Sequence, residues 1–435
     1  MITTLLFDID NTLLTNDMSQ FLPVYFRALT RFLAPYAAPE AVGAGLMAGT
    51  QAMAANLDPR RTLQQVFNEQ FQAATGINLT DLKPQVEQFY AEQFPALRAG
   101  TETRPAYPRS AARRILQWAA ERGLHLGIIS VPMLPRAAHA QRLAWAGVPE
   151  SDFPYVVLRG METARFSKPH PEFFAQILAG LSVTTDGAAP GEVLVVGDSW
   201  NDDILPAAAL GMHTFWVNDR TTAPDGGPAY WRAAGSPSDG ATPAPDVRPA
   251  GQGGLEDLER WLADGGLESL PPAEPPATPR CLLAMLAGHL AVVLEMLEGC
   301  PGQVDWHARP TPDEWSLAEI LCHLRDVETE VHTDRFRRMI RESNPYIVGI
   351  DADLWAAERD YQQQDGPAAL AAFAAARAYN LDRLRAQPPE VWARPARHSI
   401  LGPSTFAEIV RLSVQHDQLH LRQISATLRQ IADHR

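Results

Sequence analysis

Short apolar runs alternate with stretches of helical periodicity over the first 265 residues. A helix is predicted near Ala111–Arg122, between two of these runs. Buried strands separated by helices are typical of a parallel sheet with right-handed crossovers. We therefore predict an α/β doubly wound, Rossmann-like core. Its predicted strands are the run ending at Phe7, Leu126–Ile129, Tyr155–Leu158, Val193–Val196 and Thr214–Val217.

Residues 16–105 interrupt this alternation with helical periodicity alone, for example Phe21, Tyr25, Leu29 and Phe32. We predict a helical cap over 16–105, inserted into a core made of 1–15 and 106–265. The Pro- and Gly-rich stretch 221–254 reads as a loop, and 255–262 as a short helix. The prolines of 266–279 predict a semi-rigid linker.

Beyond the linker, residues 280–435 show only helical patterns. Ser316 with Glu319, and Thr405 with Glu408, form two capping-box sequences that mark helix starts. Four helices in a domain of this size predict an all-α four-helix bundle. The predicted helices are Arg280–Leu297, Ser316–Glu342, Pro367–Ala386 and Thr405–Asp433.

Charge and composition restrict the kinds of molecule that the protein could bind and the compartment in which it works. The chain has 435 residues and a net charge of −14, which argues against a nucleic-acid surface. Its cysteines, Cys281, Cys300 and Cys322, are few and widely spaced, as in a reducing cytosol. The most apolar run, Ala284–Leu297, is interrupted by a histidine and a glutamate, so no membrane span is expected. We expect a cytoplasmic protein, and the sequence leaves its oligomeric state open.

Chemically active side chains follow several predicted strands. Asp8 and Asp10 come directly after the first strand, and residues two apart on an extended chain share one side. Paired carboxylates at the carboxyl edge of a sheet need a cation or a proton to offset their repulsion. Ser130 follows the second strand, Lys168 precedes a helix, and Asp198 follows the run 193–196 with further acids at 202 and 203. In this order, over residues 1–265, they resemble the haloacid dehalogenase superfamily.

That resemblance implies a hydrolase of a small phosphorylated metabolite. Asp8 would be the nucleophile, and Asp10 would protonate the leaving alcohol and then activate water. Ser130 and Lys168 would hold phosphate oxygens. Mg²⁺ would bind Asp8, the Asp10 carbonyl, Asp198 and a second acid, for which Asp203 fits the spacing better than Asp202.

Two rival interpretations of this segment remain. Halide-removing members of the family need no acid for a leaving alcohol, so Asp10 favours phosphate ester hydrolysis over haloacid dehalogenase activity. A receiver-like signalling module also combines Asp, Ser or Thr, and Lys, but it would lack a partner such as Asp10.

The bundle carries a second constellation. His416 and His420 are four apart on one helix, and His323 occupies a comparable inward position on another. Three imidazoles converging in a bundle core predict a divalent metal site with open positions, rather than three separately satisfied core histidines. Asp326 and Asp417 could support these histidines through hydrogen bonds, but we favour the interpretation that they are exposed helix charges.

The sequences around these histidines, 314–324 and 415–420, resemble the DinB-like family of metal-binding four-helix bundles. The resemblance covers about 280–435 and implies Zn²⁺, Ni²⁺, Fe²⁺ or Mn²⁺ on His323, His416 and His420. Some relatives transfer low-molecular-weight thiols, so a thiol transferase with an auxiliary hydrolase domain is an alternative function. Cys322 adjoins His323, but adjacent helical residues point apart, so it is not expected to be a ligand.

Overall fold

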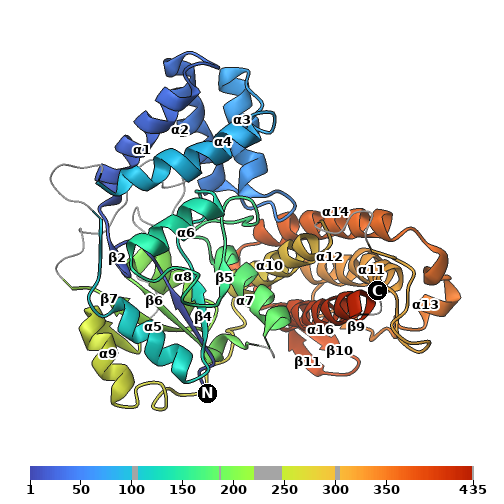
Figure 1. Cartoon of the computed structure of the whole chain (residues 1–435). Coiled ribbons are helices and arrows are strands. Elements are labelled where there is room, and N and C mark those ends of the chain that lie inside the picture. Colours follow the sequence, from blue (N-terminus) through green and yellow to red (C-terminus); the bar gives the residue numbers. More distant parts are fainter. Residues whose placement is uncertain (100–105, 186–187, 220–246, 299–303, 434–435) are drawn as a thin grey trace. The chain divides into compact units, whose positions relative to one another are not determined.

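The computed structural model describes residues 1–99, 106–185, 188–219, 247–298 and 304–433 (Figure 1). These residues form two compact units. The first contains 1–57, 61–174 and 188–275, and the second contains 58–60, 175–187 and 276–435. The boundary between Pro275 and Pro276 falls inside the stretch that was predicted as a linker. Cys300 lies outside the described residues.

A six-stranded parallel sheet forms the centre of the first unit. β1 lies between β4 and β6, so the strand order reverses at β1, where doubly wound folds place their ligands. The Rossmann-like fold predicted from the sequence is confirmed, and all five predicted strands are present. In sheet order the strands are β5 (Tyr155–Leu158), β4 (His125–Ile128), β1 (Thr4–Phe7), β6 (Val193–Gly197), β7 (His213–Val217) and β8 (Gly251–Gly253).

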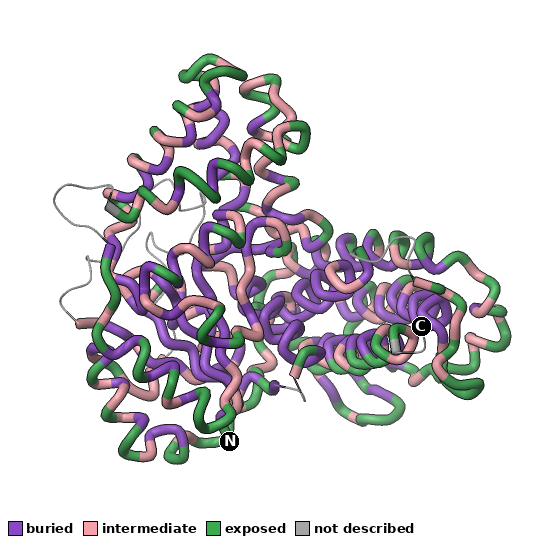
Figure 2. Tube along the Cα trace, viewed as in Figure 1, coloured by how far each residue is buried: buried purple, intermediate pink, exposed green. Residues whose placement is uncertain are grey.

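Residues 221–246 of the predicted loop lie outside the described residues, and the prediction was wrong for 251–253, which form β8. Gly-Gln-Gly has none of the apolar, β-branched residues that signal a strand. It pairs with β7 at the edge of the sheet. The central strands β1 and β6 are buried along their whole length, as expected for a sheet covered on both faces (Figure 2). Along the chain, the helices between the strands are α5 (Ala112–Glu121), α6 (Arg136–Trp145), α7 (Pro171–Thr184) and α8 (Leu205–Ala208), and α9 (Leu255–Ala263) follows β8. Most of α7, from residue 175 onward, belongs to the second unit.

The cap is helical and belongs to the same unit as the sheet (Figure 1). It leaves the core at β2 (Leu14–Thr15) and returns at β3 (Tyr107–Pro108), and the two strands pair antiparallel. Asp17 caps the first cap helix by accepting a hydrogen bond from the Ser19 amide at 3.0 Å. The cap helices are α1 (Met18–Leu33), α2 (Pro39–Ala55), α3 (Leu63–Thr75), α4 (Lys83–Gln88), a π-helical turn over Phe89–Gln93 and a 3₁₀ turn over Phe94–Ala99.

Four long helical segments build the second unit, as the sequence predicts. The second of them is continuous from Leu317 to Arg341, but its middle is a π-helical segment, Val327–His332. Ser316 and Glu319 form the expected capping box, with each side chain bonded to the other's amide. The main helices are α10 (Pro279–Glu298), α11 (Leu317–Asp326), α12 (Thr333–Arg341), α14 (Gly366–Arg385) and α16 (Phe406–Asp433).

Two short helices, a 3₁₀ turn over Tyr361–Gln363 and a small sheet also belong to the described part of this unit. The sheet pairs β9 (Tyr346–Ile347) parallel and β11 (Gly402–Thr405) antiparallel with β10 (Pro395–His398). The short helices are α13 (Trp355–Glu358) and α15 (Pro389–Trp392). By length and composition α10 could cross a membrane, but 78% of its most apolar window is buried inside the structure. That burial is typical of the core helix of a bundle.

Candidate active site and metal centre

Three carboxylates gather at the carboxyl edge of the sheet. Asp8 follows β1 and Asp198 follows the neighbouring strand β6, so their positions come directly from the parallel register. Asp203 lies in a π-helical turn over Trp200–Ile204 and accepts a hydrogen bond from the Ser199 amide at 3.0 Å. One oxygen from each of the three carboxylates lies within 4.8 Å of the others. The geometry thus brings Asp203, rather than Asp202, to the other two acids.

Lys168 is the cation of this cluster. Its ammonium donates to Asp8 Oδ1 at 2.8 Å and also to Asp203, and all three side chains are buried. Burial alone would lower the lysine pKa, but Asp203 and Asp8 raise it above its ordinary value. One lysine therefore faces three carboxylates.

The excess negative charge is visible in the acids themselves. Burial, Asp8 and Asp203 together raise the pKa of Asp198 well above its usual range. Burial also raises the pKa of Asp203 to about 7, although Lys168 opposes this. Hard oxygen donors with unbalanced charge are what a Mg²⁺ ion requires, so the residues present fit that ion.

Asp10 is held by residues that the motif analysis did not identify. The guanidinium of Arg142 donates to Asp10 Oδ2, and the Asn16 amide donates to Asp10 Oδ1 at 2.8 Å. Arg142 is 1% exposed and also reaches the Ser130 hydroxyl at 3.5 Å. Burial lowers the arginine pKa from 12.5 to about 10, so this side chain stays a cation at neutral pH.

Arg142 thus connects two predicted site residues that are far apart in sequence. It lies on α6, a helix that was not predicted, in a stretch rich in alanine. The only sequence signal was a charged residue on the same helical face as the buried Ala138 and Trp145. A cation on an otherwise apolar face indicates a buried partner.

The cap contains an apolar cavity of about 850 Å³. Side chains from α1 to α4 line it together with Met133, Leu134 and Met161 of the core. None of the three clustered carboxylates contributes to the lining.

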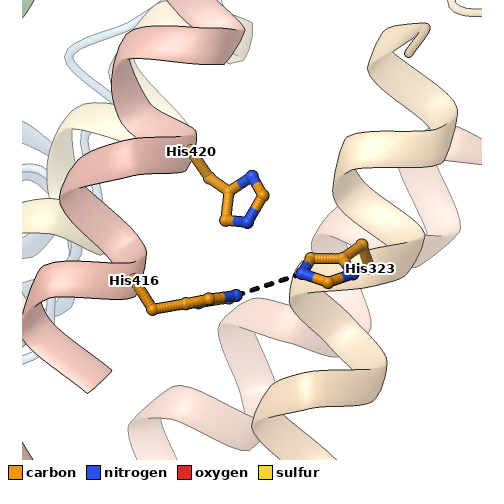
Figure 3. A group of neighbouring side chains, drawn as sticks. All are labelled: His323, His416 and His420. Carbon is orange, nitrogen blue, oxygen red and sulfur yellow. Dashed lines mark hydrogen bonds between the residues drawn. The ribbon is translucent and has the colours of Figure 1, made fainter. Parts of the chain in front are cut away.

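The three predicted histidines of the bundle come together (Figure 3). His416 and His420 project from one helix, α16, and His323 projects toward them from α11. His323 Nε2 and His416 Nε2 are 3.0 Å apart, and one nitrogen of each ring lies within 4.8 Å of the others. The indole of Trp315 covers two of the rings, with centroids 5.1 Å from His323 and 6.3 Å from His420.

All three imidazoles are held in the neutral form. Burial, then the neighbouring His420, lowers the pKa of His323 to about 4, and burial lowers that of His416 to about 2. Burial also lowers the pKa of His420. His420 Nδ1 lies 2.7 Å from Gln423 Oε1, so Nδ1 carries the proton and Nε2 keeps a lone pair. Three neutral nitrogens with one ring oriented in this way fit a divalent transition metal.

The interpretation of Asp326 and Asp417 as exposed charges was wrong. Asp417 is 4% exposed and pairs with the buried Arg377, and Asp326 is 6% exposed and accepts hydrogen bonds from Arg359 and Tyr361. Charge periodicity alone did not reveal their arginine partners on other segments. Among the described residues, neither acid forms a hydrogen bond or an ion pair with the histidine triad.

Cys322 is buried, and its thiol lies 3.6 Å from Gln364 Oε1. Burial raises the pKa of this thiol, which disfavours the thiolate form that binds metals. It is not among the clustered donors in the part of the chain that the structure describes.

Comparisons with known proteins find different families for the N-terminal and C-terminal parts of the chain. Residues 2–211 match the family model for haloacid dehalogenase-like hydrolases, and residues 285–424 match the DinB superfamily. A phosphoserine phosphatase of Thermus thermophilus is 31% identical over 179 residues, which is 41% of this chain and 61% of that protein. The match thus spans less than two thirds of this curated relative.

Parts of this chain are also similar to solved structures. A HAD phosphatase from Thermococcus onnurineus has 18% identity, with coverage of 60% of this chain and 98% of that chain and a TM-score of 0.35. YfiT from Bacillus subtilis, described as "a probable metal-dependent hydrolase with an unusual four-helix bundle topology", has 19% identity, coverage of 35% and 87%, and a TM-score of 0.32. These values are too low to transfer an activity. By the family models, the chain is similar to the haloacid dehalogenase-like hydrolases over residues 2–211 and to the DinB superfamily over residues 285–424.

Proposed function

We propose that the first unit hydrolyses the phosphate ester of a small metabolite through a phosphorylated Asp8. One observation carries this proposal. The buried Lys168 is bonded to both Asp8 and Asp203, with the Asp198 carboxylate beside them at the edge of the sheet. A carboxylate fixed by a lysine in this way is oriented, and the lysine can neutralise a phosphoryl group that approaches it.

The reaction uses two carboxylates in turn. An oxygen of Asp8 attacks phosphorus, the bond from phosphorus to the alcohol oxygen breaks, and Asp10 gives that oxygen a proton. A water molecule then attacks phosphorus and gives its proton to Asp10. The bond from phosphorus to Asp8 breaks, which releases phosphate and restores the carboxylate.

The surroundings of Asp10 place a condition on this role. Both of its oxygens accept hydrogen bonds, from Arg142 and from Asn16, so at least one bond must be given up before Asp10 donates a proton. Asp8, the Asp10 carbonyl and Asp198, with Asp203 beside them, would hold Mg²⁺. That ion supplies positive charge to the phosphoryl oxygens.

Activity on a generic aryl phosphate in Mg²⁺ tests the proposal. We expect wild-type protein to release phosphate, and Asp8→Asn to lose that activity while keeping its circular dichroism spectrum. Asp202→Asn removes the same charge from an acid outside the cluster and should stay active. Full activity in Asp8→Asn would exclude Asp8 as the nucleophile, and release of halide from a haloacid would favour the dehalogenase alternative.

For the second unit we propose a divalent transition metal on His323, His416 and His420. The 3.0 Å approach of two ring nitrogens supports this, because neutral imidazoles so close need a shared cation or proton between them. A thiol transferase is the second candidate, since a three-nitrogen site leaves a position where a thiol could bind and lose its proton.

Elemental analysis of wild type and His416→Ala tests the metal proposal. We expect one transition-metal ion per wild-type chain after repletion, and a loss of that ion in the variant with no change in phosphatase rate. Thiol-dependent turnover that is lost in His416→Ala but kept in Asp8→Asn would assign the transferase to the bundle. We place the protein in the cytoplasm, where its buried thiols Cys281 and Cys322 would stay reduced.

A further inference from the structure

The segment between β9 and α13 runs past the histidine triad. Its residue Ala352 is 9% exposed and packs in a small apolar cluster with Val327 and Val331 of the π-helical segment. This anchor fixes the position of the next residue, Asp353, whose amide also donates to Asp351 at 3.3 Å. The Asp353 side chain itself is 76% exposed.

Asp353 reaches the triad from the solvent side. Its Oδ1 lies 3.9 Å from His323 Nε2, the nitrogen that also approaches His416. One exposed carboxylate is therefore within 4 Å of a triad nitrogen, although it is not among the three donor groups that lie within 4.8 Å of one another.

Two other acids near the histidine triad, Asp417 and Glu328, are already paired with an arginine. Asp417 gives both oxygens to the guanidinium of Arg377, and so does Glu328. Both of these carboxylates are buried with that arginine. Asp353 differs because its carboxylate is exposed and is within 4 Å of a triad nitrogen.

We propose that Asp353 is a fourth protein donor to the metal of the bundle, which makes the site three nitrogens and one carboxylate. The inference rests on the proposed metal binding by the triad. Two donors that are each about 2.1 Å from one ion lie at most about 4.2 Å apart. The separations of 3.0 Å between His323 and His416 and 3.9 Å between His323 and Asp353 both fall within that limit.

A carboxylate in the donor set has chemical consequences. It cancels one positive charge of a divalent ion, and it makes the site harder than three imidazoles alone. Ions such as Mn²⁺ and Fe²⁺ should gain affinity relative to an all-nitrogen site. The Asp353 carboxylate would then occupy one coordination position of the metal in place of a water molecule.

Cobalt titration of the full-length protein tests the inference. The protein is freed of metal with a chelator and titrated with Co²⁺ in excess Mg²⁺, which occupies the oxygen-donor site of the first unit. Affinity comes from chelator competition, and the donor set comes from the visible absorption of bound Co²⁺. Asp353→Asn is compared with Asp351→Asn, which removes the same charge two residues away and keeps an oxygen that accepts the Asp353 amide.

We expect Asp353→Asn to weaken Co²⁺ binding at least about tenfold and to change the spectrum, while Asp351→Asn matches wild type in both. An unchanged spectrum in Asp353→Asn would overturn the inference even if affinity falls, because the carboxylate would then act through another group. Equal behaviour of the two variants would overturn it as well. Failure of wild type to bind Co²⁺ would instead refute the metal site of the bundle.

Discussion

Replacing Arg377 with methionine should destabilise the second unit severely. The guanidinium is 1% exposed and makes a two-pronged contact with each of two buried carboxylates, Glu328 and Asp417. It also donates to the Leu286 carbonyl at 3.3 Å. The substitution keeps an unbranched side chain but leaves two buried negative charges without their cation.

The magnitude follows from the partners that remain. Loss of one member of a buried ion pair costs about 3–5 kcal/mol. Glu328 keeps hydrogen bonds from Asn380 at 2.8 Å and from His332 at 3.0 Å, so the costs for the two carboxylates do not simply add. We expect a loss of about 4 kcal/mol, which is roughly a thousandfold rise in the opening constant of these helices.

Amide hydrogen exchange of the full chain measures this change. Peptides from α11 and α16 should exchange faster in Arg377→Met, while peptides from the sheet of the first unit serve as an internal reference. Arg383→Met is the matched control, because that arginine lies on the same helix and bonds to the hydroxyl of the exposed Tyr379. A difference below about 1 kcal/mol between the two variants would refute the reasoning.

The same network predicts a dependence on acid. Burial opposes the charge of Glu328, but Arg377 and His332 together lower its pKa from 4.5 to about 2. A carboxylate with a depressed pKa in the folded state contributes stability above its unfolded pKa and loses that contribution as the pH falls through the folded pKa. The exchange protection of α11 should therefore be constant above about pH 5 and decline between about pH 4.5 and 2.

Two further substitutions test the first unit. Asp203→Asn removes one of the two carboxylates that fix Lys168, so phosphate release should fall at least about a hundredfold with the circular dichroism spectrum unchanged, and near-normal release would exclude that role. In α2, a Cβ at Gly49 would lie 2.5 Å from the ring of Phe67, so Gly49→Ala should destabilise the cap by about 1–3 kcal/mol in urea-dependent proteolysis. Gly43→Ala meets no atom within 4 Å and should leave the cap as stable or more so, and similar losses in both variants would contradict the packing argument.

Local patterns predicted much of this protein. Buried strands such as Val193–Gly197 are continuous apolar runs, and the parallel register then places the acids that follow them at one edge. The spacing of His416 and His420 on one helix likewise predicted that they share a face, and the capping box at Ser316 predicted where α11 begins. These features depend on residues that are close in sequence.

The remaining features depend on contacts between distant residues. Arg142 and Asp10 are 132 positions apart, and no local pattern on α6 names the acid that its arginine meets. The strand Pro395–His398 begins with a residue that usually argues against strands, and it forms through pairing with Gly402–Thr405 and Tyr346–Ile347. Asp353 lies in a segment without periodicity, so its approach to His323 could be seen only in three dimensions.

The paired strands β2 and β3 have a mechanical consequence. Both chain passages into the cap run through this ribbon, so the cap is attached by a double strand rather than by two independent tethers. Asn16 directly follows β2 and donates to Asp10, so this hydrogen bond links the ribbon to the acid. If Asp10 is the proton donor proposed above, a movement of the cap and the loss of the hydrogen bond from Asn16 to Asp10 would be coupled through this ribbon.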